Sequence, residues 1–424
     1  MRHTAPLRYA RLSNAEVAID RLFRQNAGRV VATIAKAFGD IQIGEDAVQE
    51  AYIRLLKLSE SAGLPENPQA WVMRAARNCA IDRLRRSLTQ SEIAERVARL
   101  ELAIPDRDAG DSRFPDDRLE LIFACCHPAL TLESRVALTL RSVCGLTTRQ
   151  IASAFFVPET TMTRRLARAK RKLREAGGSF ALPPAGRLAE RLDSVLGAIY
   201  LIFNEGYKAS GGAQLTNVEL CEEAIWLAGL LHQLLPREAE ALGLYCLLLF
   251  SHSRHATRVA PSGAVQPLEF QDRSRWDMTA INTAAGLLVK HGPLRPTPYV
   301  IEAEIAAHHA TAERYEDTDW TRIAALYEML AILNKSPAVE LNRAIAVGMA
   351  FGYERGLAAL DSLSSAPVLR DHYLLHAGRA DFLRRLGRSY EATVAYSRAL
   401  SDVPTLPERI YLEERLRELD PDRE

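Results

Sequence analysis

Residues 146–173 contain the pattern that most restricts how this chain can fold, because they specify two short helices joined by a tight turn. Thr147 and Gln150 have the spacing of a capping box, which opens a helix. Pro158 suits the first position of the next helix, and Glu159 complements the positive end of its dipole. In that second helix, apolar side chains recur at helical spacing at Met162, Leu166, Ala169 and Leu173. The sequence therefore predicts a helix-turn-helix whose second helix buries one face.

The opposite face of the second helix is strongly basic. It carries hydroxyl groups near its start and cations along its length, at Thr160, Thr161, Arg164, Arg165, Arg168, Arg171 and Lys172. Phosphates attract such a face, and side chains near the helix start can reach base edges in the major groove. The alternative is a surface helix with solvated arginines, but the coincidence of cap, turn and cationic face favours DNA. Phe156 departs from the pattern, because the turn often holds a glycine there.

Helical spacing of apolar residues continues through nearly the whole chain of 424 residues, of which 48% are hydrophobic. We therefore expect an all-α fold of several domains. Changes in composition place the boundaries: a domain at 1–87, an acidic linker with Pro and Gly at 88–117, the helix-turn-helix domain at 118–178, a helical extension at 179–335 and helical repeats at 336–424. The sequence shows no signal peptide and no apolar run of membrane-spanning length, which predicts a soluble cytoplasmic protein.

The net charge of +1 hides an asymmetry along the chain. Residues 1–180 carry 29 Lys and Arg against 21 Asp and Glu, and the remaining residues carry 25 against 32. A cationic front half suits nucleic acid, and an anionic back half does not. Attraction between the two halves is a hypothesis that follows from this balance.

The last part of the chain has the spacing of a 34-residue tetratricopeptide unit. Small residues, aromatic residues and helix breakers fall at its characteristic places from Tyr373 onward, at Ala380, Gly387, Ala392, Tyr396, Ala399 and Pro404. Small residues permit close contact between paired helices, and Pro ends the pair. We expect a tetratricopeptide-like end, with a weaker copy before it around Gly352.

Three helices are expected in the first domain, at 16–38, 45–58 and 68–86, with a loop at 59–67. In the second helix Val48, Ala51, Tyr52 and Leu55 face inward by their spacing. A polar group with two carboxylates shares the opposite side, at Asp46, Gln49 and Glu50. This face is a candidate for docking on a partner protein.

The third helix of the first domain combines cations, an aromatic ring, an amide and a carboxylate. These side chains are Trp71, Arg74, Arg77, Asn78, Asp82, Arg85 and Arg86. Aromatic rings stack on unpaired bases while arginines hold the backbone, so this helix is a candidate site for opened DNA. Trp71 equally suits the core.

Neither a metal site nor an enzyme is expected from the cysteines and histidines. The six cysteines lack CxxC spacing and suit reduced core thiols, and Cys125, Cys126 and His127 are followed by no second ligand pair. His252 with His255 lacks the Glu of a metalloprotease helix, and His308 and His309 point apart. We expect no cofactor, although a ligand pocket or a hydrolytic site in the back half is the enzymatic alternative.

Several segments together resemble bacterial extracytoplasmic-function sigma factors. The resemblance in the front half rests on residues 46–52, 67–71, 76–86 and the helix-turn-helix. In the back half, four segments resemble the subgroup that carries a long tetratricopeptide-like extension: 125–130, 201–207, 271–277 and 341–344.

The resemblance implies a role for each front segment. The helix with Asp46, Gln49 and Glu50 would dock on the clamp helices of core RNA polymerase. The 59–67 loop would pocket a flipped base of the minus-ten promoter element, with Arg77, Asn78, Asp82 and Arg85 beside it. The helix from Glu159 would read the minus-thirty-five element, and the acidic linker would follow the path of the RNA through the polymerase.

Two alternatives stay open at this point. A helix-turn-helix repressor would explain residues 118–178 but leaves 46–86 without a role. In the extension, a charged segment is either an internal ion-pair and packing cluster or a regulatory contact with a ligand or polymerase; its residues are Asp272, Arg273, Arg275, Trp276 and Asp277.

Overall fold

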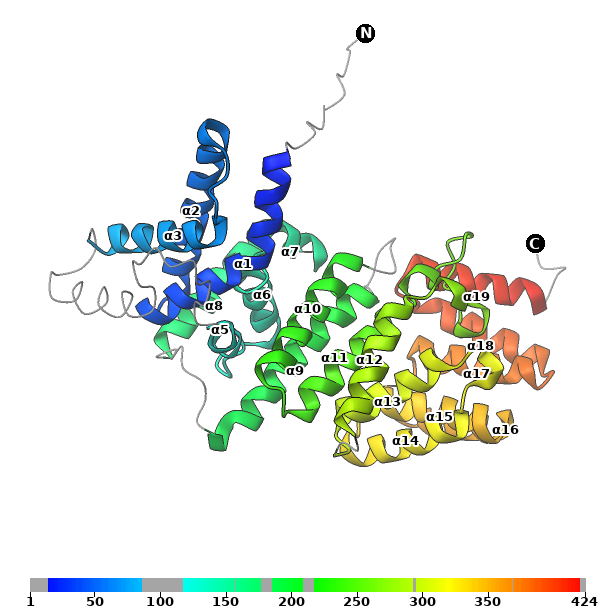
Figure 1. The fold of residues 1–424 in the computed structure, drawn as a ribbon. Helices are drawn as coiled ribbons and strands as arrows, with labels where there is room; N and C mark the ends of the chain where they lie inside the picture. The colour runs from blue at the N-terminus through cyan, green and yellow to red at the C-terminus, as the bar shows by residue number, and fades with distance from the viewer. Residues whose placement is uncertain are drawn as a thin grey trace, which may run out of the picture. The chain divides into compact units, whose positions relative to one another are not determined.

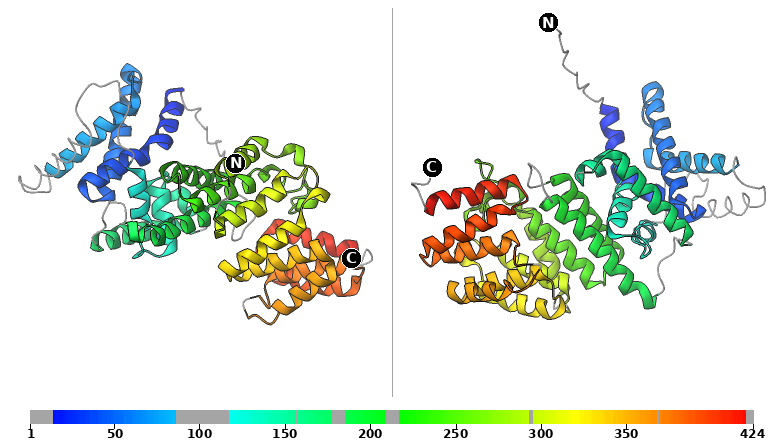
Figure 2. Two further views of the ribbon diagram at one scale, coloured as in Figure 1. Left: turned by 60° about the horizontal axis from the view of Figure 1, so that its bottom comes forward. Right: turned by 180° about the vertical axis from the view of Figure 1, so that it is seen from behind.

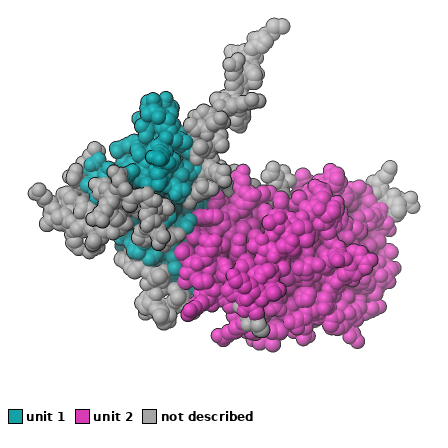
Figure 3. Space-filling model, in the orientation of Figure 1, with its two compact units in different colours: residues 1–198 teal, residues 199–424 magenta. Residues whose placement is uncertain are grey.

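The expected all-α fold is confirmed by the computed structural model, shown as a ribbon in Figures 1 and 2. It describes residues 14–85, 117–155, 157–176, 185–208, 217–292, 295–367 and 369–419. These ranges contain no β-strand, and an isolated β-bridge joins Val259 and Val265. None of the helices in them is long and apolar enough to span a membrane. Contacts divide the chain into two compact units, residues 1–198 and 199–424, coloured separately in Figure 3.

Unit 1 opens with three packed helices, α1 (Asn14–Phe38), α2 (Ile41–Ala62) and α3 (Pro68–Arg85). The residues predicted to face inward from α2 are buried, and the ring of Tyr52 packs edge-on against Phe23 with centroids 4.8 Å apart. Helix α2 begins four residues earlier than predicted, because the Asp40 side chain caps it by accepting from the Gln42 amide at 2.8 Å.

The predicted loop at 59–67 is wrong in its first four residues, because α2 continues to Ala62. The Ser59 hydroxyl donates to the Leu56 carbonyl at 2.7 Å, and the Ser61 hydroxyl donates to the Lys57 carbonyl at 3.2 Å. Such bonds to the preceding turn let serine stay within a helix. The helix ends at Gly63, whose φ of 79° is accessible to glycine at little cost. The loop between α2 and α3 is therefore residues 63–67.

The helix-turn-helix follows α5 (Arg118–Cys125) and α6 (Leu132–Ser142) and consists of α7 (Thr148–Ala154) and α8 (Glu159–Glu175). The capping box is confirmed. The backbone N–H of Gln150 donates to the Thr147 hydroxyl at 3.2 Å, and the backbone N–H of Thr147 donates to the side-chain Oε1 of Gln150 at 2.8 Å. Pro158 is the residue before α8 rather than its first helical position. Phe156 lies outside the described residues, so its place in the turn stays a prediction.

Unit 2 is formed by successive helices, the first of which, α9, begins in unit 1. The helices are α9 (Ala185–Tyr207), α10 (Val218–Leu234), α11 (Ala239–His252), α12 (Met278–His291), α13 (Pro298–Thr311), α14 (Trp320–Leu333), α15 (Pro337–Phe351), α16 (Tyr353–Leu363), α17 (Tyr373–Arg385), α18 (Ser389–Ser401) and α19 (Leu406–Leu419). Short 3₁₀ turns connect some of them, at His255–Thr257, Leu268–Phe270, Arg273–Arg275 and Tyr315–Asp317.

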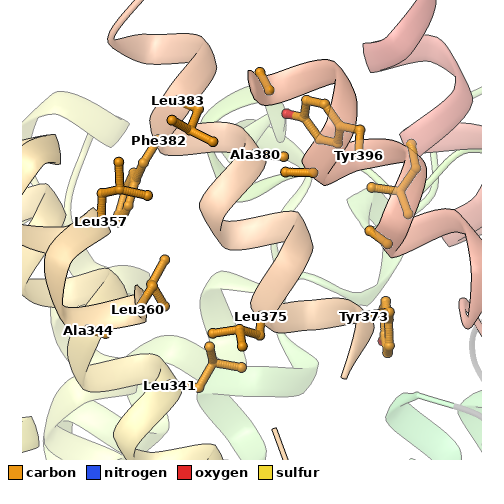
Figure 4. Close-up of a cluster of buried hydrophobic side chains, with 14 of the residues drawn as sticks. Leu341, Ala344, Leu357, Leu360, Tyr373, Leu375, Ala380, Phe382, Leu383 and Tyr396 are labelled. Atoms are coloured by element: carbon orange, nitrogen blue, oxygen red, sulfur yellow. The ribbon is translucent and has the colours of Figure 1, made fainter. Parts of the chain in front are cut away.

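The last helices pack as pairs, α15 on α16 and α17 on α18. Gly387, with φ 75°, makes the turn between α17 and α18, where the repeat spacing places a glycine. Four residues of the predicted repeat pattern lie in the core that these helices share, namely Ala380, Ala392, Tyr396 and Ala399. Figure 4 shows Ala380 and Tyr396 within this core. These helix pairs agree with a tetratricopeptide-like end, which stays a prediction in its finer detail.

We predict that Gly356→Ala destabilises unit 2. A Cβ at Gly356 would lie 2.5 Å from both the Gly348 Cα and the Phe382 Cε2 atoms, so α15 and α16 would have to separate. Overpacking of this kind typically costs about 1–3 kcal/mol, more than the helix propensity gained. Gly378→Ala is the matched control, because its Cβ would meet Ile345 at an ordinary 3.5 Å. Urea unfolding followed by circular dichroism should show a lower midpoint for Gly356→Ala alone; equal midpoints would contradict the close approach.

Candidate nucleic-acid and polymerase interface

Helix α8 separates an apolar face from a basic one, as its sequence predicts. Its buried residues are the four predicted, and six of the seven candidate DNA-contacting residues are exposed, with Arg165 half-buried. The basic face borders a hollow of about 630 Å³ beside the start of α6, and Arg165, Arg168, Arg171 and Lys172 line part of it. The Arg149 guanidinium lies 3.4 Å from the Glu159 carboxylate and links α7 to the start of α8. This surface presents cations where a polyanion can reach them.

The three candidate polymerase-binding residues lie on one side of α2 and differ in their partners. Gln49 is exposed. Glu50 forms an ion pair with Arg54 at 3.1 Å, between side chains that are nearly half exposed. Asp46 accepts a hydrogen bond from Gln42 at 2.7 Å and forms an ion pair with Arg83 of α3.

The candidate residues for opened DNA are spread around α3. Asn78 and Asp82 are exposed, and Trp71 and Arg74 are half-buried. Arg77 is buried, with 7% of its surface exposed, and so does not face solvent with Asn78. Arg85 is the last residue of α3, and Arg86 lies outside the described residues.

A buried carboxylate that sequence reasoning missed joins the two halves of unit 1. Glu45 of α2 is 6% exposed, and its Oε1 accepts from the Ser142 hydroxyl at 2.6 Å. Its Oε2 accepts from Lys170 Nζ of α8 at 2.7 Å and lies 3.6 Å from Arg141 Nε of α6. Lys170 also donates to the Gln42 side chain at 2.8 Å. Glu45 lies on the apolar side of α2 with Val48 and Tyr52. Because a buried carboxylate needs a partner that replaces water, its position in the sequence predicts a cation packed against this side.

Further contacts around this cluster connect the same helices. Asp117, just before α5, accepts from Thr33 of α1 at 3.0 Å and from Lys36 at 2.6 Å. Burial would lower the pKa of Lys36, but its hydrogen bonds to Asp117 and Glu120 raise the pKa above its usual value. Gly28 of α1 lies against the Val143 carbonyl so closely that a Cβ would stand 2.1 Å from that oxygen. Helices α1 and α2 thus pack directly on α5, α6 and α8.

The charged segment of unit 2, 272–277, makes capping and packing contacts. Asp272 and Asp277 cap the helical turns that follow them, each accepting from a backbone amide at 3.0 Å. Trp276 is buried and donates from its indole to the Thr257 hydroxyl at 3.0 Å. The Arg273 guanidinium lies over the Trp276 ring at 4.4 Å and donates to the carbonyls of His309 and Ala312 at 2.8 and 2.7 Å. Arg275 donates to the Ala256 carbonyl at 3.3 Å.

The cysteines and histidines lie within packed surroundings. All six cysteines are buried and free, and burial raises the pKa of the Cys126 thiol to about 11. The rings of His252 and His255 stack with centroids 4.5 Å apart, and burial lowers the pKa of His252 to about 4. Over the described ranges, no three His, Cys, Asp or Glu side chains are grouped as metal ligands would be.

Comparisons with protein families divide the chain in the same way as its helices. Residues 22–88 match the family model for sigma-70 region 2, and residues 120–173 match that for sigma-70 region 4. Residues 191–291 match a family of unknown function, DUF6596. The two sigma matches cover most of α1–α3 and of α5–α8.

Similar proteins include a full-length relative and two shorter ones. The "Uncharacterized protein R00370" of Rhizobium meliloti is 41% identical over 92% of this chain and 92% of its own length. The "Probable ECF RNA polymerase sigma factor SigI" of Mycobacterium tuberculosis is 25% identical over 39% of this chain, which spans 58% of that protein. The "ECF RNA polymerase sigma factor SigE" of Mycolicibacterium smegmatis is 26% identical over 37% of this chain and 60% of its own length. No solved structure matches the chain.

The exposed basic helix of a capped helix-turn-helix, the helices before it and the two region matches all agree. The chain belongs to the extracytoplasmic-function RNA polymerase sigma factors and carries a long helical C-terminal extension.

Proposed function

We propose that this sigma factor binds core RNA polymerase, selects promoters through two separate DNA contacts, and is regulated by its C-terminal extension. The observation that carries the proposal is the exposed cationic face of α8, next to a second helical module that holds aromatic, amide and carboxylate groups. The repressor alternative accounts for α5–α8 alone and gives α1–α3 no task.

Helix α8 would lie in the major groove at the minus-thirty-five element. Thr160, Thr161 and Arg164 stand in its first turns, where a recognition helix meets base edges. Arg168, Arg171 and Lys172 extend along the exposed side and suit phosphates. Met162 and Leu166 hold the opposite side against the rest of the helix-turn-helix, so the reading face is presented by a rigid element.

Helix α3 and the loop at 63–67 would hold the opened minus-ten element. Extruding a base costs a few kcal/mol, so a pocket that rewards the flipped base makes melting selective for sequence. Asn78 and Asp82 are exposed and can hydrogen-bond to a base edge, and the half-buried ring of Trp71 can support stacking. Arg77 would contribute from beneath this surface, by supporting it rather than by touching DNA in the present arrangement.

Helix α2 would dock on the clamp helices through Gln49, Glu50 and Asp46. Gln49 and Glu50 are at the surface in the present arrangement. Asp46 is held by Gln42 and Arg83, and it would exchange one of these partners for a basic group of the polymerase.

Unit 1 would open when the holoenzyme engages a promoter. The minus-ten and minus-thirty-five elements are about 25 base pairs apart, or roughly 85 Å along B-DNA at about 3.4 Å per step. The 17 residues of α8 span only about 25 Å, and Lys170 of this helix lies 2.7 Å from Glu45 of α2. Both elements cannot be contacted while this ion pair holds the modules together, so the pair would break on initiation.

The extension would act on the sigma modules through its charge or its helical repeats. Its excess of carboxylates over cations opposes the cationic excess of the first 180 residues. An anionic extension can compete with DNA for the basic face or hold it in position. The charged segment 272–277, which makes capping and packing contacts, would contribute to the extension chiefly as part of its framework.

Two arginines of α8 should separate base reading from phosphate binding. We expect Arg164→Ala to weaken promoter binding by about 1–3 kcal/mol and to relax the preference at one base pair. Arg168→Ala should weaken binding to all sequences alike and reduce the slope of log K against log salt by about 1. Arg398→Ala, an exposed arginine paired with Asp371 in unit 2, serves as the control and should change neither. Fluorescence anisotropy at several salt concentrations measures both quantities, and equal effects of the three variants would count against the proposed face.

Breaking the Glu45–Lys170 pair should favour the open state. We expect Lys170→Glu, which sets two carboxylates against each other, to increase the affinity for core polymerase by at least about fivefold, or about 1 kcal/mol. The double variant Glu45→Lys with Lys170→Glu restores attraction and should return the affinity toward the original value. Donor and acceptor dyes on α2 and α8 would report the separation directly. Unchanged separation and affinity in Lys170→Glu would disprove opening at this contact.

Run-off transcription tests the function as a whole. Adding the full chain to bacterial core polymerase should give promoter-specific transcripts, whereas a repressor gives none. A chain that ends at Gly178 retains α1–α8 and should differ from the full chain in transcript yield, because the extension is proposed to regulate. Equal yields would remove the regulatory role and leave the sigma function intact.

A further inference from the structure

Unit 2 contains a cavity of about 530 Å³ that plays no part in the proposed promoter contacts. Its volume is in the range of small-molecule sites in proteins. The cavity is lined by three of the segments on which the resemblance to the extended subgroup rests, namely 201–207, 271–277 and 341–344. These segments are far apart in the chain, and each contributes one or more lining side chains, among them Asn204, Trp276 and Asn342. The cavity is therefore where these segments meet.

One face of α13 forms a long side of the cavity. Glu302, Ile305, Ala306 and His309 follow the i, i+3, i+4, i+7 spacing of a single helical face, and all four line the cavity. Seven residues of α-helix rise about 10 Å, so Glu302 and His309 mark positions about that far apart. The cavity can thus hold an elongated molecule along α13.

The Glu302 end is acidic and has no cation of its own. Glu302 accepts a hydrogen bond from Tyr200, and the other groups that interact with it are Glu240 and Tyr327. Among the described residues, no Lys, Arg or His lies within ion-pair distance of its carboxylate. Burial, with the nearby Glu240, raises the pKa of Glu302 to about 7. A ligand cation would supply the missing partner, and the rings of Tyr200 and Tyr327 suit a cation as well.

The other end is cationic, and no carboxylate of the described residues lines it. Arg254 lines the cavity and lies 5.9 Å from the Tyr207 ring centroid, and no acidic side chain of the described ranges pairs with it. Burial and the positive charges of Arg254 and Arg273 lower the pKa of His309 to about 3, so its imidazole is neutral. His309 Nδ1 and the Tyr207 hydroxyl are buried there without a hydrogen-bond partner. A ligand carboxylate would pair with the Arg254 guanidinium. Its oxygens could also accept a hydrogen bond from the Tyr207 hydroxyl.

We propose that this cavity binds an elongated zwitterion, with its ammonium group at Glu302, its carboxylate at Arg254 and an apolar body along α13. An extended peptide spans about 3.3–3.6 Å per residue, so a free tripeptide matches the rise of about 10 Å from Glu302 to His309, which lies at the Arg254 end. Asn204 and Asn342 each offer an amide that can both donate to and accept from a peptide group. Ile305 and Ala306 supply the apolar wall between the ends.

Calorimetry with the full-length chain and the peptide Ala-Phe-Ala tests this proposal without polymerase or DNA, so its outcome is independent of the sigma function. The free peptide should bind and raise the melting temperature of the protein. N-acetylation, which removes the ammonium, and C-amidation, which removes the carboxylate, should each weaken binding about tenfold or more. Equal binding of the free and blocked peptides, or no binding of the free peptide at millimolar concentration, would overturn the proposal.

Variants locate the two ends. Glu302→Gln should lower the affinity for the free peptide about tenfold but leave the affinity for the acetylated peptide unchanged. Arg254→Gln should likewise lower the affinity for the free peptide about tenfold and leave that for the amidated peptide unchanged. Glu304→Gln is the matched control, because Glu304 belongs to the same helix but lies 3.8 Å from Arg322 outside the cavity. Its affinity should stay within about twofold. If Glu304→Gln weakens binding as much as Glu302→Gln, the carboxylate at the cavity is not the ammonium site.

The affinity should also depend on pH in a defined direction. An ammonium group favours the ionised form of Glu302, so binding should strengthen as pH rises through about 7, where the free carboxyl loses its proton. The peptide amine loses its charge above about pH 8, which weakens binding again. Of the groups that face the ligand, burial raises the pKa of Tyr200 and of Tyr327, so both stay neutral in this interval, and His309 stays neutral because its pKa is lowered to about 3. A flat profile in the wild type, or a rise that persists in Glu302→Gln, would contradict the role of Glu302.

Discussion

The burial of Glu45 is the constraint on which the arrangement of unit 1 depends. A carboxylate on the apolar side of α2 can leave water only if cations and donors replace its hydration. Lys170, Arg141 and Ser142 do so from α6 and α8, and with Asp117 they fasten α1 and α2 to the helices that follow. An apolar contact of equal size would expose hydrophobic surface on opening. A polar contact returns its groups to water, which makes it suited to a contact that has to be reversible.

Helix α8 can combine this contact with the proposed reading of DNA because its sides have different chemistry. Met162 and Leu166 anchor it, the arginines face solvent, and Lys170 lies at the border between the two faces, where only 12% of its side chain is exposed. One helix would therefore couple the proposed closed state to the position of the proposed reading face. If α2 leaves as proposed, Lys170 would become an additional exposed cation on α8, and the electrostatic attraction of this helix for DNA would increase.

Features that depend on neighbouring residues, such as helix caps and buried helix faces, could be predicted from the sequence. Contacts between residues far apart in the chain could not. The capping box at Thr147 and the buried face of α8 depend on neighbours within a few residues, and both are confirmed. The end of α2 was misplaced, because serines that usually favour loops bond here to their own helix. Which of 54 Lys and Arg would pair with Glu45 could not be read from spacing, since Lys170 is 125 residues away. The meeting of three recognised segments at one cavity is likewise a property of the fold.

The charged side chains at the cavity of unit 2 differ from other charged side chains of this unit in whether they have an ion-pair partner. Two charge clusters elsewhere in this unit are satisfied by the protein: Glu408 accepts from Tyr373 and Thr405 at 2.7 Å and pairs with Lys208, and Arg385 pairs with Asp381 and Glu269. Arg254 and Glu302 follow another pattern, since each faces the cavity without a charged partner among the described residues. No ion pair joins them to each other or to another described side chain, and the positive charge of Arg254 acts instead on His309, two turns along α13 from Glu302. Sequences that satisfy their buried charges throughout break this rule mainly at functional sites, so the two unpaired groups are best understood as the ends of a binding site.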